Sequence, residues 1–222
     1  MLDSIEFSPK DTLILAGDYV DRGKENLQML EWIEKCPSNV ILLMGNHDME
    51  FISSVELLSV AVKDINSNEA LAKGYESIKM NELGVYFDYY GSVKELIYEN
   101  NCALKDLLKW CRIIKNFPLF YEMQVEGKRH IIVHAGYKID CNDEFYIYSR
   151  DEAYLEGGIV DGVIIAGHTP TLCLDSIVYN YGEVFSYHNP KNNCTFYDID
   201  CGAAYGGKLA CLRLEDKVVF YK

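Results

Sequence analysis

Short apolar runs separated by an amphipathic segment open the chain. Residues 12–16 (Thr-Leu-Ile-Leu-Ala) form a continuous apolar run that stops at Gly17, and residues 40–44 form a second run that stops at Gly45. Such runs are typical of strands that are covered on both faces of a sheet. Between them, residues 25–35 carry leucine and isoleucine at helical spacing. The order strand, helix, strand predicts a right-handed unit with parallel strands.

The middle of the chain has a different pattern. Residues 53–116 carry Leu, Ile and Tyr at mixed spacing that predicts helices, and no catalytic-looking motif lies there. We expect this stretch to be a helical insertion or cap inside one domain over residues 1–222. Strand patterns then return at 129–133 and 163–166. In the tail, β-branched and aromatic residues at short spacing predict antiparallel pairing. The tail segments are 193–200, 208–214 and 218–221.

Polar residues with a neighbouring glycine follow four of the predicted strands. These motifs are GDYVDRG at 17–23, GNHD at 45–48, HAG at 134–136 and GHTP at 167–170. In open α/β sheets, sites form beyond the carboxyl ends of the strands. Glycine lets the backbone turn sharply at such a point. We therefore expect side chains from distant parts of the chain to meet in one cleft.

The residue types in these motifs suit a divalent metal. Asp18 offers a carboxylate that could bridge two ions, Asn46 offers an amide oxygen, and His134 and His168 offer imidazole nitrogens. Mixed nitrogen and oxygen ligands suit Mn, Fe or Zn. Two such ions about 3.5–4 Å apart can clamp a phosphate and activate a water for in-line attack.

Three further side chains in the first two motifs suit phosphate chemistry. His47 could protonate the leaving oxygen, and Asp21 could orient the imidazole and raise its basicity. Arg22 supplies a planar fork that matches phosphate oxygens.

The four motifs, in this order, resemble the signature of the calcineurin-like phosphoprotein phosphatases, which bacterial phosphatases and symmetrical diadenosine tetraphosphatases share. The resemblance runs from about residue 11 to residue 214. It implies an α/β fold, a metallophosphoesterase-type β-sandwich of mixed sheets flanked by helices. It also implies a role for each matching residue. These are Asp18 as bridging ligand, Asn46, His134 and His168 as the other ligands of the second metal, His47 and Asp21 as the general-acid pair, and Arg22 and Arg150 as phosphate-binding arginines.

One part of the family pattern has no match. The family opens with Asp-x-His-Gly, which supplies two ligands of the first metal, whereas the first histidine here is His47. We therefore expect the chain to be N-terminally incomplete, with the missing motif encoded upstream of Met1. The resemblance implies two metal ions for the intact site and one ion for a chain that lacks this motif.

The amino-acid composition limits the classes of binding partner that we expect. Acidic side chains outnumber basic ones 34 to 21, for a formal charge of -13, which argues against broad nucleic-acid binding. The eight cysteines are scattered without a C-x-x-C pair, which favours reduced thiols over disulfides or a zinc cluster. No apolar run is long enough to span a membrane. We expect a cytoplasmic protein whose partner is a phosphorylated protein or nucleotide.

The first interpretation is a phosphoric monoester hydrolase that acts on phosphoserine or phosphothreonine in proteins. The alternatives are a nucleotide hydrolase resembling diadenosine tetraphosphatase, and a catalytically weak binding module with a degraded metal site. Local alternatives also stay open. Arg150 could form a surface ion pair with Asp151 or Glu152, and Asp48 could cap a helix or support a ligand.

Overall fold

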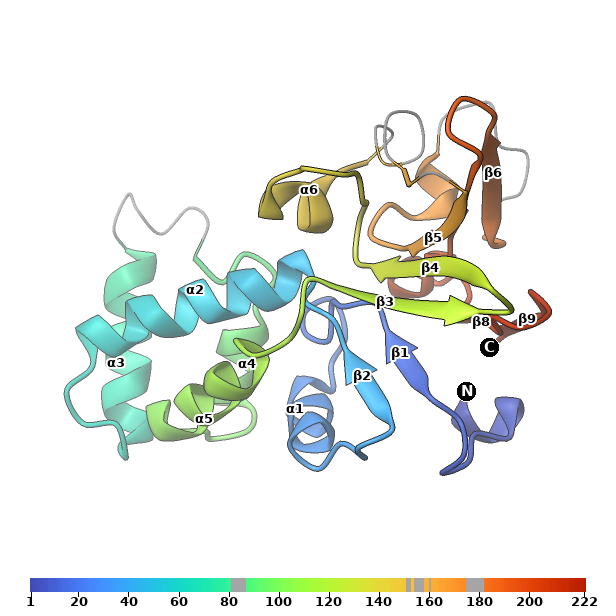
Figure 1. Cartoon of the computed structure of the whole chain (residues 1–222). Coiled ribbons are helices and arrows are strands. Elements are labelled where there is room, and N and C mark those ends of the chain that lie inside the picture. Colours follow the sequence, from blue (N-terminus) through green and yellow to red (C-terminus); the bar gives the residue numbers. More distant parts are fainter. Residues whose placement is uncertain (81–86, 151–152, 154–157, 160, 175–181) are drawn as a thin grey trace. The chain divides into compact units, whose positions relative to one another are not determined.

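The computed structural model describes residues 1–80, 87–150, 153, 158–159, 161–174 and 182–222 (Figure 1). The chain divides into two compact units. The sheet unit consists of Met1–Ala16, Ser38–Gly45 and Pro118–Lys222, and the helical unit consists of Gly17–Pro37 and Asn46–Phe117. The expected insertion at 53–116 within a single domain stays a prediction, and residues 81–86 of it lie outside the described residues.

A five-stranded mixed sheet forms the centre of the sheet unit, in the order β3-β4-β5-β7-β6. The central strands β4 (Lys128–Val133), β5 (Gly162–Ala166) and β7 (Cys194–Asp198) are parallel. The outer strands β3 (Phe120–Val125) and β6 (Phe185–Asn189) pair antiparallel to them. All five residues of β5 are buried, as its continuous apolar sequence predicts.

Successive residues of the central strands point to opposite faces and build two cores. One face carries Ile131, Val133, Ile164, Ala166 and Phe196 and packs on Tyr137 and Ile159. Helix α6 (Asp143–Tyr148) contributes the half-buried Tyr146 to this core. The other face carries Ile132, Val163 and Ile165 and packs on Ile14, Ile41 and Leu43. Two sheets therefore face each other across the second core, as a sandwich of mixed sheets requires.

The second sheet contains β1 (Leu13–Leu15) and β2 (Val40–Leu42), which pair in parallel as predicted. The expectation that the first strand is covered on both faces is wrong. All three residues of β1 are only half-buried. In the described part of the chain β1 pairs with β2 alone, and Ile14 is the residue that packs on the five-stranded sheet.

The tail of the sheet unit matches its predicted pattern only in part. Strands β8 (Ala210–Leu212) and β9 (Val219–Tyr221) pair antiparallel, as expected. Strand β7 pairs antiparallel with β6 and parallel with β5. The sequence pattern did not predict a strand at the position of β6. Short 3₁₀ helices lie at Leu2–Ile5, Thr171–Cys173 and Ala203–Tyr205.

The helical unit contains α1 (Asn26–Glu34), α2 (Asn46–Ala61), α3 (Asn68–Lys79), α4 (Ser92–Tyr98) and α5 (Leu104–Ile114). Helices α2, α3, α4 and α5 lie together in Figure 1, and α2 contacts each of the other three. Each helix buries apolar side chains on its inner face. Fully buried examples are Leu30, Val55, Leu71, Leu96 and Leu107. Helix α2 begins at Asn46, so the GNHD motif forms its first turn.

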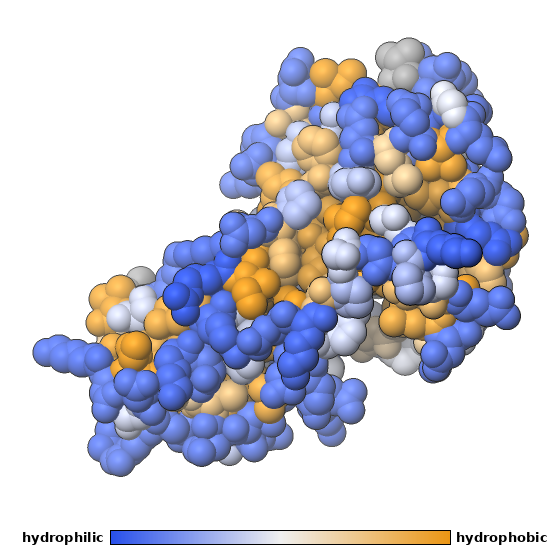
Figure 2. Space-filling view, turned by 60° about the horizontal axis from the view of Figure 1, so that its bottom comes forward, coloured by the Kyte–Doolittle hydropathy of each residue, from blue (hydrophilic) through white to orange (hydrophobic). Residues whose placement is uncertain are grey.

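Outward-facing positions are mostly polar. The face in Figure 2 is largely hydrophilic, with separate hydrophobic patches. Among the described residues, no helix combines the length and the apolar character that crossing a bilayer requires.

A buried carboxyl group, that of Asp198, lies at the end of β7. Asp198 is 3% exposed, and burial raises its pKa well above the ordinary value, although its Oδ1 accepts a hydrogen bond from the Asp200 N–H. Below the unfolded pKa near 3.8 the group is protonated in both states and costs nothing. As pH rises through the window up to the folded pKa, the unfolded chain loses its proton first, so stability falls.

We therefore expect Asp198→Asn to be more stable than the unmodified chain at pH 7, with the difference vanishing towards pH 3.8. Each tenfold change in proton affinity corresponds to about 1.4 kcal/mol. Urea unfolding at several pH values measures the difference. A difference that is independent of pH would contradict the assignment.

Candidate functional site

The GDYVDRG motif forms a tight turn in the helical unit. Gly17, Asp18, Asp21 and Arg22 have φ angles of 96°, 62°, 73° and 60°. Side-chain-bearing residues rarely adopt this left-handed region, and such residues gather at functional sites, where the surrounding structure holds them in place. The turn therefore needs strong partners for its backbone.

Two buried side chains supply those partners. Asp48, which is 0% exposed, accepts the Asp18 N–H with Oδ2 at 2.9 Å and the Tyr19 N–H with Oδ1 at 3.0 Å. The Oδ1 of Asn26 accepts the Asp21 N–H at 2.9 Å. Asp48 thus supports the residue predicted as the bridging ligand, one of the two roles left open for it.

Asp48→Ala is expected to lower the free energy of unfolding by about 2–4 kcal/mol, because two N–H groups of the turn lose the side chain that accepts from both. Urea denaturation measures the change. Asp48→Asn, which keeps one acceptor oxygen, should lose less. A change below about 0.5 kcal/mol for the alanine variant would show that the turn does not depend on this carboxylate.

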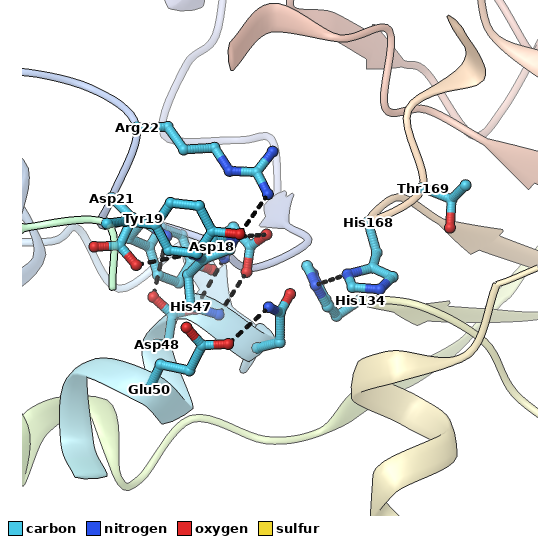
Figure 3. Close-up of polar contacts among 12 residues, drawn as sticks. Asp18, Tyr19, Asp21, Arg22, His47, Asp48, Glu50, His134, His168 and Thr169 are labelled. Atoms are coloured by element: carbon cyan, nitrogen blue, oxygen red, sulfur yellow. Dashed lines mark hydrogen bonds and ion pairs between the residues drawn. The ribbon is translucent and has the colours of Figure 1, made fainter. Parts of the chain in front are cut away.

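His47 lies between the two aspartates of the turn (Figure 3). Its Nδ1 is 2.8 Å from Asp21 Oδ2, and because a carboxylate only accepts, Nδ1–H is the donor. Its backbone N–H donates to Asp18 Oδ1 at 3.1 Å, and its Nε2 is 3.9 Å from Asp18 Oδ2. Burial acts to lower the pKa of His47, but the Asp21 hydrogen bond and the charges of Asp18 and Asp21 outweigh it and raise the pKa.

Glu50 is a neighbour that the sequence analysis missed. It lies one helical turn after Asn46 on α2, and the Asn46 amide donates to its Oε1 at 3.4 Å. This contact directs the nitrogen of the amide towards Glu50. Asp21, His47 and Glu50 also offer ligand atoms within 4.8 Å of one another. The spacing of four residues on a helix was the signal that could have indicated Glu50.

Tyr90 is the second missed neighbour. Its ring centroid lies 4.5 Å from that of His47, and the Arg22 guanidinium lies 5.1 Å from the Tyr90 centroid. Arg22 Nη2 also donates to the Tyr90 hydroxyl at 3.4 Å. The sequence pattern did not indicate a role for Tyr90.

His134 and His168 come together in the sheet unit. They follow β4 and β5, which are parallel neighbours, so both strands end at the same edge of the sheet. His134 Nε2 and His168 Nδ1 are 3.1 Å apart, and Figure 3 shows the two side chains next to each other. His134 Nδ1–H donates to the Ala16 carbonyl at 2.6 Å, which fixes this tautomer and presents Nε2 to His168.

This nitrogen pair fits a metal ion. Two imidazole nitrogens that bind one zinc-like ion at about 2.0–2.1 Å lie about 3.3 Å apart in tetrahedral geometry. The observed 3.1 Å is close to that separation, and it also suits an N–H···N hydrogen bond. The donor set and the tautomer of His134 are therefore compatible with a ligand role.

Arg150 lies just after α6, is exposed, and donates from Nη1 to Thr169 Oγ1 at 3.4 Å. The contact places Arg150 beside the GHTP motif of the same unit. The alternative ion pair with Asp151 or Glu152 falls on residues outside the described part of the chain.

The predicted residues thus form two groups. Asp18, Asp21, Arg22, Asn46 and His47 belong to the helical unit, and His134, Arg150 and His168 belong to the sheet unit. That both groups meet at one metal centre stays a prediction.

Comparison with known proteins identifies the family to which the chain is similar. The family described as Calcineurin-like phosphoesterase matches residues 1–203. The chain is 37% identical over 263 aligned positions to a protein of Methylobacillus flagellatus, covering 99% of this chain and 88% of that protein. A Nitrosospira multiformis protein is 35% identical over 256 positions with the same coverage. A Chromobacterium violaceum protein is 28% identical over 137 residues, and the match spans 37% of its length.

All three relatives are named symmetrical bis(5'-nucleosyl)-tetraphosphatase. The family match covers nearly the whole chain and includes all four motifs. The chain therefore belongs to the calcineurin-like phosphoesterases, hydrolases that use divalent metal ions.

Proposed function

We propose that this chain hydrolyses dinucleoside polyphosphates, with symmetrical dinucleoside tetraphosphates as the preferred class. The observation that carries the proposal is the similarity to two symmetrical tetraphosphatases over 99% of the chain. The arrangement of Asp21, His47 and Arg22 supports it, because a polyphosphate needs a proton donor and cationic groups around the scissile bond.

Asp18, Asn46, His134 and His168 would hold the metal. The carbonyl of Ala16 accepts the hydrogen bond from His134. Asp18 lies two residues after Ala16, so the covalent chain keeps the Cα atoms of Ala16 and Asp18 within about 7 Å of each other. Bound ions would supply an activated water for in-line attack on phosphorus. We propose Mn, Fe or Zn as these ions, because their ligands would be a mixture of nitrogen and oxygen atoms.

His47 would act on the leaving group. As the bond between phosphorus and the bridging oxygen breaks, the oxygen gains negative charge and takes the proton from Nε2 of His47. Asp21 holds the opposite ring nitrogen at 2.8 Å, which fixes the ring and stabilises its charged form. Arg22 and Arg150 would bind non-bridging phosphate oxygens.

A phosphoserine or phosphothreonine substrate, the first interpretation from the sequence, becomes the second choice. The relatives are named for nucleotides with phosphoanhydride bonds, and this favours the nucleotide alternative over a phosphoric monoester hydrolase.

A substrate panel tests the proposal. Diadenosine tetraphosphate, a phosphoserine peptide and p-nitrophenyl phosphate are compared with added Mn²⁺ and with EDTA. We expect the largest kcat/KM for the dinucleotide and loss of activity in EDTA. A larger value for the phosphopeptide would overturn the substrate class. Bound metal with negligible turnover of all three would favour the binding module.

A further inference from the structure

Two adjacent aromatic side chains project from the segment that precedes α4. Tyr89 is 69% exposed and Tyr90 is 42% exposed. Their rings lie 4.9 Å apart at 85°. Tyr90 also contacts His47 and Arg22, whereas Tyr89 presents most of its ring to solvent. A large aromatic ring left exposed beside a phosphate-binding arginine has free surface for a ligand.

The segment that carries both tyrosines is firmly held. Asp88, which is 7% exposed, accepts the Val93 and Lys94 N–H groups and the Tyr75 hydroxyl, each at 2.9 Å. The Asp88 N–H donates to Ser54 Oγ at 3.2 Å. Burial of Asp88 with this set of bonds ties the segment to α2, α3 and α4. The tyrosines are therefore preorganised, which lowers the entropic cost of binding a ligand.

A groove of about 560 Å³ lies beside the two rings. This volume is within the usual range for small-molecule sites. Its described lining includes Tyr75, Tyr89, Tyr90, Gly91, Lys79, Lys94, Glu76, Asp88, Glu95 and Glu99. Four carboxyl groups against two ammonium groups make the groove unfavourable for a phosphate. They suit a neutral group that stacks on aromatic rings and donates hydroxyl hydrogen bonds, such as a nucleoside.

We propose that Tyr89 and Tyr90 stack a nucleobase of the substrate, with its ribose in the groove and its phosphates directed to Arg22. The inference rests on the proposed function and names the part of the chain that would recognise the nucleoside. It explains why a tyrosine pair stands next to Arg22, since one ligand would use both the ring surface and the guanidinium.

Tyr89→Ala tests the kinetic consequence. Base–aromatic stacking is worth enough to expect about a tenfold change. We expect the ratio of kcat/KM for diadenosine tetraphosphate to that for inorganic tripolyphosphate to fall about tenfold. Tyr89→Phe, which keeps the ring, should retain the ratio. Met80→Ala, which removes another highly exposed apolar side chain of this unit, is the matched control.

Calorimetric binding of adenosine monophosphate separates this inference from the proposed function. We expect the nucleotide to bind more tightly than inorganic phosphate, and Tyr89→Ala to lose about tenfold in affinity. Unchanged affinity and an unchanged kinetic ratio in that variant would overturn the inference while the hydrolase stands. Tyrosine-dependent nucleotide binding without dinucleotide hydrolysis would overturn the proposed function while the inference stands.

Discussion

Replacing His47 by Asn is expected to lower kcat for diadenosine tetraphosphate by about 10²–10⁴-fold, the usual contribution of a positioned proton donor. The reason is geometric: His47 is buried, Asp21 fixes its ring at 2.8 Å, and Asp18 lies at its other nitrogen. Asparagine keeps the backbone N–H that donates to Asp18 but cannot deliver the proton. Steady-state kinetics with a matched circular-dichroism spectrum measures the effect.

The leaving group shows whether the loss is one of proton donation. A p-nitrophenolate leaving group needs less protonation than phenolate, because the pKa of an unsubstituted phenol is about 10, so His47→Asn should affect p-nitrophenyl phosphate much less than phenyl phosphate. His188→Asn is the matched control, because His188 contacts Thr195 on the neighbouring strand and has no predicted role. Equal losses for both substrates would assign His47 to structure or binding instead.

Sequence patterns correctly predicted several strands, and they predicted burial less well. The apolar run at 163–166 predicted a strand, and all five residues of β5 are buried, while β1 and β2 pair in parallel as expected. The same pattern misjudged β1, which is half-buried because a short apolar run does not say how many neighbours a strand has. Strand β6 was missed because its residues are polar and aromatic at an edge, where only one face is buried.

The site residues also divide into those that the sequence motifs indicated and those that only the structure shows. Motif spacing indicated Asp18, Asp21, Asn46 and His47, and the structure gathers them in one unit. It did not indicate Asn26, whose side chain accepts a hydrogen bond from the Asp21 backbone N–H. Nor did it indicate Tyr90, which reaches His47 and Arg22 from about 40 and 70 positions away along the sequence. Such contacts depend on packing between helices, and local periodicity carries no information about them.

His134→Ala is expected to release a metal ion and to lower kcat/KM for the dinucleotide by more than about 100-fold. Loss of a group that only orients a ligand already costs 10–100-fold, so loss of the ligand itself should exceed that range. Metal content after gel filtration in Mn²⁺ measures the first effect. The second readout is Tm, because a metal that binds the folded chain raises it, and the variant should lack most of that rise.

The competing explanation is that His134 and His168 merely hydrogen-bond to each other. His134→Ala also removes the bond to the Ala16 carbonyl, so a loss of stability alone would not decide between the two. His168→Ala leaves that bond in place and removes the imidazole whose Nδ1 lies 3.1 Å from His134 Nε2. If both variants keep the metal content and the Mn²⁺-induced rise in Tm, the pair is structural and the metal centre lies elsewhere. If both lose them, the two strand ends supply ligands to the same ion.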